Sequence, residues 1–123
     1  MQQLQWDKDG EVLAVLQPQG QNVTLYEIGT RKATLLPLNQ QSPSFMAWSR
    51  TGPQLAVGTV KGNLVVYNKT TRKRLPISGL HSKPITCGAW NQENKLALSS
   101  LDRMVSISDV DGNTLDTTVC AVL

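Results

Sequence analysis

Three tryptophans divide the chain at a fixed interval. They stand at positions 6, 48 and 90, so that 42 residues separate each tryptophan from the next. Each tryptophan begins a similar phrase, in which a polar turn leads into leucine, alanine and a further aliphatic residue: WDKDGEVLAV, WSRTGPQLAVG and WNQENKLALSS. A period of this length is a signature of repeat architectures. We therefore expect three copies of one structural unit.

Each unit carries four short candidate strands, and no window shows sustained helical periodicity. The strands that end at a tryptophan are QQLQW, SFMAW and ITCGAW, and each Leu-Ala phrase supplies the next strand. The strands that follow are NVTLYEI, NLVVYNK and MVSISDV, and a more polar strand closes each unit: KATLLP, KRLPIS and TLDTTV. Four antiparallel strands in such a unit predict a propeller blade. The predicted fold is all-β, a propeller segment with blades at approximately residues 1–37, 42–79 and 84–120.

Composition supports one globular unit without a membrane segment. The chain has 123 residues, of which 40% are hydrophobic and 17% are charged, which suits a single domain with a buried core. It contains no run of about 18 apolar residues and no signal-peptide pattern, so we expect a soluble, intracellular chain without a direct membrane span. The net charge of +3 suits an acidic partner surface but is too small to indicate nucleic acid as a partner.

The two cysteines, Cys87 and Cys120, indicate free thiols. They are too few for a disulfide scaffold, and they lack the C-x-x-C spacing of a zinc site. The last four residues, CAVL, match the C-a-a-X prenylation pattern. Because Cys120 directly follows a candidate strand and no flexible polybasic stretch precedes it, we do not expect prenylation at Cys120.

The segment GTVKG at residues 58–62 has two glycines and a lysine, as a phosphate-binding loop would. A phosphate loop leads into a helix and carries Lys-Ser or Lys-Thr after its second glycine. Here Gly62 is followed by Asn63 and an apolar run, and LQPQG and SSLDR occupy the same place in the other units. We therefore interpret GTVKG as the hairpin turn between the second and third strands of its unit.

Two acidic turns contain closely spaced carboxylates, DKDGE at residues 7–11 and DVDGN at residues 109–113. An EF-hand calcium loop needs a third oxygen ligand before its glycine and a glutamate that closes a twelve-residue loop, and neither turn has them. Asp-Gly is an ordinary hairpin sequence. We therefore predict hairpins here, and neither a metal site nor a cofactor.

Two basic clusters recur at one place in the repeat, the connection from the third to the fourth strand. A propeller would bring both connections to one rim. The candidate partner-binding residues on this rim are Arg31, Lys32, Arg72, Lys73 and Arg74. No interleaved aromatic residues support nucleic-acid binding, and a solvated basic edge that binds nothing remains the alternative.

The third unit resembles a WD repeat in its details. GLHSKPITCGAW resembles the Gly-His opening of such a repeat, and SSLDRMVSISD resembles its Ser-x-Asp turn and terminal strand. Asp109 matches the aspartate of the family's Trp-Asp dipeptide, but Ser108 stands in place of the tryptophan. The other units have Tyr-Glu and Tyr-Asn at this place, so the repeats are degenerate.

The WD resemblance implies a structural network of hydrogen bonds. In the family, histidine, serine, aspartate and tryptophan hold each blade together. Here His81, Ser99 or Ser100, and Asp102 would form a partial version of that network. A lone histidine without a partnered nucleophile has no reaction to perform, so we expect no catalytic residue.

Longer phrases resemble the N-terminal WD repeats of the WD-repeat subunit family of intraflagellar transport complex A: WDKDGEVLAV, LAVGTVKGNLVVYN and KPITCGAWNQENKLAL. The resemblance covers nearly the whole chain. It implies a non-catalytic scaffold that acts with other subunits of that complex in retrograde intraciliary transport and cilium assembly. The implied location is the cilium, the ciliary base and the cytoplasm.

Two other classes of function remain open from the sequence. The first is a WD-repeat adaptor of another complex, such as a vesicle coat or a ubiquitin ligase, because propellers serve many functions. The second and weaker is an enzyme, because one histidine without a nucleophile motif or metal-spaced ligands leaves little to carry a reaction.

The number of units limits what the chain can form alone. Propellers close with about four to eight blades, so three units predict an incomplete ring whose terminal blades expose apolar faces. We therefore expect a segment of a larger protein, which is a fragment, a partial gene model or a shortened isoform. Expressed alone, it should aggregate, or associate with other copies or with the missing blades.

Overall fold

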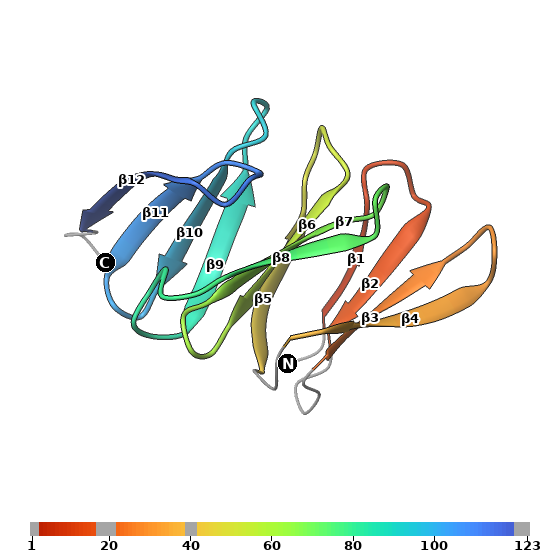
Figure 1. Ribbon diagram of the computed structural model, residues 1–123, viewed down its shortest axis with the longest axis horizontal. Coiled ribbons are helices and arrows are strands. Elements are labelled where there is room, and N and C mark those ends of the chain that lie inside the picture. The colour runs from red at the N-terminus through yellow and green to blue at the C-terminus, as the bar shows by residue number, and fades with distance from the viewer. Residues whose placement is uncertain (1–2, 17–21, 39–41, 120–123) are drawn as a thin grey trace.

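The computed structural model describes residues 3–16, 22–38 and 42–119. Within these ranges the chain forms twelve strands and no helix, so none of the described residues belongs to a helix that could cross a membrane. The strands make three antiparallel sheets that follow one another along the chain and do not close into a ring (Figure 1). The prediction of an all-β propeller segment with three four-stranded blades in an incomplete ring is confirmed.

Each sheet is one blade, and its strands pair in chain order. Blade 1 contains β1 (Gln3–Trp6), β2 (Val12–Leu16), β3 (Asn22–Glu27) and β4 (Lys32–Pro37). Blade 2 contains β5 (Pro43–Trp48), β6 (Gln54–Thr59), β7 (Leu64–Asn68) and β8 (Lys73–Ile77). Blade 3 contains β9 (Ile85–Trp90), β10 (Leu96–Ser100), β11 (Met104–Ser108) and β12 (Thr114–Val119). The fourth strand of each blade is an edge of its sheet.

Alternating burial explains why the Leu-Ala phrases form strands. In β2, Val12, Ala14 and Leu16 are buried, whereas Leu13 and Val15 are only half-buried. Successive side chains of a strand point to opposite faces of the sheet. One face of blade 1 therefore packs against blade 2, and the other face is turned away from it.

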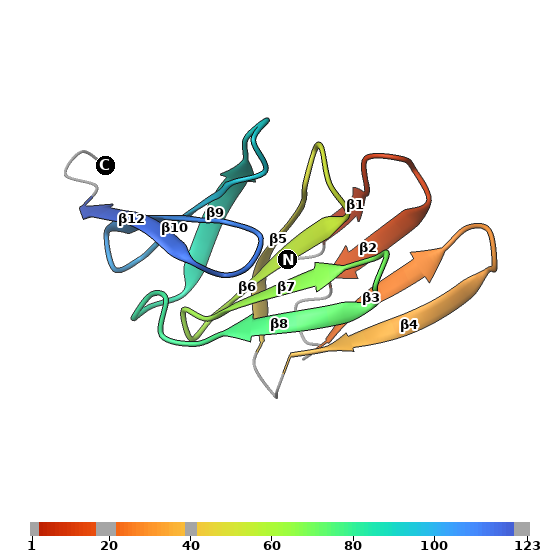
Figure 2. The same cartoon turned by 45° about the horizontal axis from the view of Figure 1, so that its top comes forward.

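Two apolar cores hold the blades together, one between blades 1 and 2 and one between blades 2 and 3. Figure 2 shows the three sheets following one another in chain order, with blade 2 in the middle. In the first core, Met46 and Leu55 of blade 2 pack in one cluster with Leu25 of blade 1. In the second core, Phe45 of blade 2 lies in one cluster with Leu96 of blade 3. The two faces of blade 2 thus serve different neighbours.

The repeated tryptophans also join neighbouring blades. The indole Nε1 of Trp48 donates a hydrogen bond to the carbonyl oxygen of Gln5 in blade 1, at 3.1 Å. The indole Nε1 of Trp90 makes the equivalent bond to Ala47 in blade 2, at 2.9 Å. The 42-residue period therefore marks two repeated features, a strand and a hydrogen bond between neighbouring blades. The remaining tryptophan, Trp6, is 51% exposed.

The outward face of blade 1 is apolar and exposed. The register of β1 with β2 pairs Leu4 with Val15 and Trp6 with Leu13, which places these side chains on one face. Leu35 belongs to the same face through its place in β4, and Leu4 and Leu35 are 65% and 60% exposed. The corresponding face of blade 2 is the one that packs against blade 1.

The segment GTVKG completes one strand and turns the chain into the next. Gly58 and Thr59 are the last residues of β6, and residues 60–63 connect β6 to β7. Gly62 has a φ of 84°, and a Cβ at this position would lie 2.1 Å from the carbonyl oxygen of His81. The backbone angle and the close approach each require glycine here.

Candidate functional site

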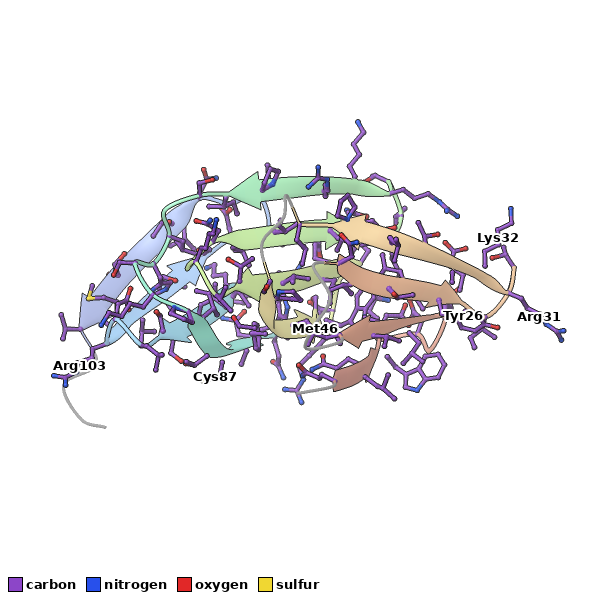
Figure 3. The ribbon with its side chains drawn as sticks, turned by 90° about the horizontal axis from the view of Figure 1, so that it is seen from below. Tyr26, Arg31, Lys32, Met46, Cys87 and Arg103 are labelled. Carbon is purple, nitrogen blue, oxygen red and sulfur yellow. The ribbon has the colours of Figure 1, made fainter. Side chains whose placement is uncertain are left out.

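The predicted basic rim lies on two equivalent turns. Arg31 and Lys32 lie where β3 turns into β4, and Figure 3 shows both side chains extending away from the sheets at one end of the molecule. Arg72, Lys73 and Arg74 lie where β7 turns into β8. All five residues are exposed.

Two arginines of blade 2 reach across to blade 1. The Nη1 atom of Arg72 lies 3.1 Å from a carboxylate oxygen of Glu27, while the Arg72 side chain remains 65% exposed. The Nη1 atom of Arg74 donates a hydrogen bond to the carbonyl oxygen of Pro37, at 3.0 Å. The structure therefore brings these two arginines to the boundary between blades 1 and 2, which we call the first seam.

The three other rim cations, Arg31, Lys32 and Lys73, make no ion pair with another residue in the part of the chain that the structure describes. Arg31 and Arg72 occupy equivalent turn positions with left-handed φ angles of 56° and 60°. This conformation costs a side chain such as arginine about 1 kcal/mol. Arg103, in the turn between β10 and β11, has the same conformation with a φ of 66°, so this conformation is not particular to the rim.

A cleft of 230 Å³ opens along the first seam. Its lining includes Leu25 and Leu36 of blade 1 and Tyr67 of blade 2, together with Arg72 and Arg74. Burial raises the pKa of the Tyr67 hydroxyl, so this group stays protonated. The sequence analysis did not find this cleft.

A second cavity of 350 Å³ continues the cleft along the same seam. The two cavities share four lining residues: Val12, Glu27, Lys69 and Arg72. The apolar surface of the cleft is therefore continuous with the charged surface of the second cavity.

Lys69 of blade 2 forms ion pairs with the acidic turn of blade 1. Its ammonium group forms an ion pair with the buried carboxylate of Asp7 and lies 3.0 Å from Asp9 and 3.2 Å from Glu11. Burial lowers the pKa of Lys69, but hydrogen bonds to the three carboxylates outweigh it and raise the pKa overall. Residues more than 50 positions apart thus form one charged cluster.

The same cluster explains what the DKDGE turn does. Burial would raise the pKa of Asp7, but the Lys69 ammonium and the backbone N–H groups of Val12 and Glu11 hold that pKa below its usual value. One carboxylate oxygen from each of Asp7, Asp9 and Glu11 lies close enough to the others to hold a cation. The lysine ammonium supplies that positive charge.

His81 forms the centre of a buried network in blade 3. Its Nδ1 atom lies 2.9 Å from a carboxylate oxygen of Asp102, and its Nε2 atom lies 2.9 Å from the hydroxyl oxygen of Ser106. Burial would raise the pKa of Asp102, but N–H groups of Ser82 and Met104 and the His81 ring hold it below its usual value. The network ties the loop before β9 to the turn and strand that follow β10.

The structure brings His81 and Asp102 together but places Ser99 elsewhere. The Ser99 hydroxyl lies 3.2 Å from that of Thr86, and Ser100 donates to the carbonyl oxygen of Lys83 at 2.9 Å. The histidine's serine partner is Ser106, which the sequence analysis missed. The alternation of β11 offered a signal, because Ser106 and Ser108 lie on the buried face of that strand.

The chain of Ser106, His81 and Asp102 has the order of a hydrolase triad, but it is closed to substrates. Ser106 is fully buried, and the His81 side chain has no exposed surface. A nucleophilic serine must reach a bound substrate and must lie beside donors that stabilise an oxyanion. The contacts of this network instead join segments of one blade.

Ser108 differs from its neighbours in having no hydrogen-bond partner. It is fully buried, and its hydroxyl is the orphaned buried side-chain group among the described residues. It stands where the sequence comparison expects the tryptophan of a WD repeat. Of the two cysteines, Cys87 is exposed as a free thiol, and Cys120 lies outside the described residues.

Similarity to known proteins identifies the family. The family model described as "WDR19 first beta-propeller" matches residues 1–122. The chain is 45% identical over 113 residues to WD repeat-containing protein 19 of Homo sapiens, which covers 91% of this chain and 8% of that protein. It is 31% identical over 117 residues to WD repeat-containing protein dyf-2 of Caenorhabditis elegans, covering 92% of this chain and 8% of that protein.

A solved structure shares the fold. A chain in a crystal structure of the mitotic checkpoint complex matches with a TM-score of 0.77 at 22% identity, over 93% of this chain and 35% of that chain. The present chain spans about 8% of the length of the two curated relatives. The match of the family model over nearly every residue, together with these relatives, shows that the chain belongs to the family of the WDR19 first beta-propeller.

Proposed function

We propose that this chain is a non-catalytic scaffold segment of a subunit of intraflagellar transport complex A. Its partners are other subunits of that complex, and its roles are retrograde intraciliary transport and cilium assembly. Its location is the cilium, the ciliary base and the cytoplasm. The observation that carries the proposal is the family match over residues 1–122, which agrees with the resemblance drawn from the repeat phrases.

The absence of catalysis is part of the proposal. It is supported by the burial of His81 and Ser106, the one arrangement of described residues that has the order of a catalytic triad. It is also supported by Lys69, whose ammonium group already contacts all three carboxylates of the acidic cluster of blade 1.

The contact with partner subunits is assigned to the basic rim. Its support is the exposure of the five rim residues and the lack of an ion pair at Arg31, Lys32 and Lys73 within the described part of the chain. Arg72 and Arg74 also hold the first seam, so reversing their charges would disturb the fold as well as a partner contact. Arg31, Lys32 and Lys73 are therefore the better residues to change.

The test uses the tagged protein in ciliated cells. We expect Arg31→Glu combined with Lys32→Glu and Lys73→Glu to reduce recovery of the other complex A subunits, more strongly at low salt than at high salt. Exposed charges act over about 8 Å at physiological ionic strength and over less at high salt. If the triple variant recovers the other subunits as well as the unaltered protein does at both salt concentrations, the rim is solvated surface that binds no partner.

Arg103 supplies the matched control. Like Arg31 it lies in a strand-connecting turn with a positive φ, here 66°, but Figure 3 shows it at the opposite end of the molecule. Arg103→Glu should leave recovery unchanged. If the unaltered protein recovers no complex A subunit from ciliated cells, the proposed function is wrong.

A further inference from the structure

We propose that a second copy of this chain covers both ends of the arc, so that blade 1 of each copy packs against blade 3 of the other. Blades 1 and 3 lie at opposite ends of the arc (Figure 1). Two arcs of three blades give six blades, within the range of about four to eight with which propellers close. The proposal concerns the chain's contact with itself and does not rest on the scaffold function proposed above.

The outward face of blade 1 has the pattern of a face that is already an interface in blade 2. Leu4 and Trp6 hold the register positions that Met46 and Trp48 hold in blade 2. Met46 and Trp48 are buried in the core between blades 1 and 2, whereas Leu4 and Trp6 are exposed. This face of blade 1, which we call the first open face, therefore has the form of a contact between blades and lacks a neighbouring blade among the described residues.

The other end of the arc carries the complementary face. Ala89, Ala97 and Ile107 lie in one row across β9, β10 and β11. Leu96 and Leu98 of β10 are buried in the core with blade 2, so the row between them lies on the face turned away from that blade. We call it the second open face. Ala89 is exposed, and Ala97 and Ile107 are half-buried.

The tryptophan hydrogen bonds indicate how the two open faces would meet. At both boundaries between blades, an indole N–H donates to the carbonyl oxygen of the residue before the tryptophan of the preceding blade: Trp48 to Gln5, and Trp90 to Ala47. Ala89 is the next acceptor in this series, because it precedes Trp90 and pairs with β10 as Ala47 pairs with β6. The remaining donor is Trp6, so we assign a bond from Trp6 of one copy to Ala89 of the other. It forms only between copies and adds nothing to the stability of the single chain.

Both open faces can be buried without burying a charge. On the inner three strands of each terminal blade, the side chains of these faces are uncharged: Leu4, Trp6, Leu13, Val15, Thr24 and Tyr26 on blade 1, and Cys87, Ala89, Ala97, Ser99, Val105 and Ile107 on blade 3. Each copy offers one face of each kind, so a two-fold axis satisfies both faces of both copies at once. Removal of apolar surface from water drives the contact.

The first test measures the number of copies by sedimentation equilibrium and native mass spectrometry of residues 1–123. We expect a reversible equilibrium between one copy and two. Leu4→Asp and Ile107→Asp, one on each open face, should each raise the dissociation constant about tenfold or more, because each buries a charge in an apolar contact. Leu101→Asp, in an exposed turn, is the control and should leave it unchanged.

A mixture of the two variants distinguishes the proposed contact from one between two identical faces. Leu4→Asp keeps an intact second open face, and Ile107→Asp keeps an intact first open face. Mixing them should therefore restore one of the two contacts and give dimers at concentrations where each variant alone is a monomer. If two first open faces met instead, Ile107→Asp alone would associate as the unaltered chain does, and the proposal would be wrong. The thermal melt of each variant checks that it folds.

Cross-linking tests which residues meet. A Cβ at Gly88 of blade 3 would lie 3.2 Å from the ring of Phe45 of blade 2. Cys87 and Leu4 hold the register positions of Phe45 and Gly88, so Cys87 of one copy would face Leu4 of the other. A short bismaleimide should therefore join Leu4→Cys of one copy to Cys87 of the other and give a covalent dimer.

Leu35→Cys is the matched control. Leu35 lies on the same face as Leu4 but in β4, three strands away, so this variant should not be joined to Cys87. Both variants carry Cys120→Ser, which leaves Cys87 as their one natural cysteine. Peptide mapping identifies the joined residues. Links between two Leu4→Cys positions in place of Leu4→Cys with Cys87 would contradict the arrangement.

Two further outcomes overturn the inference. A chain that stays monomeric would mean that a different protein, or a further segment of a longer chain, covers the open faces. Species that grow beyond two copies would mean that the arcs join without closing. Recovery of complex A subunits by a chain that forms no dimer would retain the proposed function and reject the second copy, whereas a dimer that recovers none would do the reverse.

Discussion

The indole nitrogen of Trp90 donates to the main-chain oxygen of Ala47 at 2.9 Å, from blade 3 to blade 2. Trp90→Phe keeps an aromatic ring but removes the donor and leaves the Ala47 carbonyl without it. We expect a loss of about 1 kcal/mol in the free energy of unfolding, measured by urea denaturation. Trp6→Phe is the matched control, because the exposed Trp6 ring makes no such bond to another described residue, and its stability should not change.

Lys69→Met should destabilise the chain by about 2 kcal/mol, because the buried Asp7 carboxylate would lose its cation. Lys8→Met is the control. Lys8 pairs with the same exposed Asp9 that Lys69 contacts, and its removal should have little effect, as is usual for surface pairs. Equal effects of the two substitutions, measured by urea denaturation, would show that the ion pairs of Lys69 do not stabilise the first seam.

Ser108→Ala should raise the free energy of unfolding by about 1 kcal/mol, because it removes a buried hydroxyl that has no hydrogen-bond partner. Ser106→Ala, two residues earlier on the same strand face, should do the opposite, because it leaves Nε2 of His81 without its partner. The pair therefore compares one chemical change in two environments. A loss of stability in both variants would mean that the Ser108 hydroxyl is satisfied in solution.

Acid should weaken the chain through Asp102. Its pKa in the folded chain lies below the usual 3.8, so folding favours the ionised form. The resulting stability is fully present above the pKa of the unfolded chain and is lost as pH falls through the lower pKa of the folded chain. We expect thermal melting temperatures to fall between about pH 5 and pH 2, with a shallower fall in Asp102→Asn. Identical slopes would contradict the low pKa.

The exposed apolar face of blade 1 should make residues 1–123 self-associate. Leu4→Asp and Leu35→Asp place charges on that face, where Leu4 and Leu35 are the most exposed apolar residues. Sedimentation velocity should show larger species for the unaltered chain and smaller species for the double variant. Leu101→Asp, at a residue 62% exposed in the turn between β10 and β11, is a control on blade 3. A monomeric unaltered chain would contradict this prediction.

The fold could be predicted because it depends on local patterns that the chain repeats. The period of the tryptophans marks the repeated unit, the alternation in strands such as β2 and β10 indicates which side chains face a core, and the structure has the strands in the predicted order. The same tryptophans link the blades, as Trp48 and Gln5 show, although spacing alone cannot reveal which acceptor a side chain meets.

The candidate site depends on contacts that no local pattern encodes. Lys69 and Asp7 lie 62 positions apart, and only the stacking of blades brings them together. The basic rim could be located from the repeat, but not the pairing of Arg72 with Glu27 or the cleft beside it. The sequence motif indicates Ser99 or Ser100, whereas the serine beside His81 is Ser106, because a motif gives position along a strand and the network depends on the face to which a side chain points.

The two boundaries between neighbouring blades differ in the interactions that stabilise them. The first seam carries ion pairs from Lys69 and Arg72, whereas blades 2 and 3 meet through neutral bonds such as those of Trp90 with Ala47 and Ser44 with Ile85. Salt weakens the attraction of charged pairs but leaves neutral hydrogen bonds nearly unaffected. Ionic strength should therefore weaken the exposed pair of Arg72 with Glu27 more than any of these contacts between blades 2 and 3, so the strength of one boundary depends on the surrounding electrolyte more than that of the other.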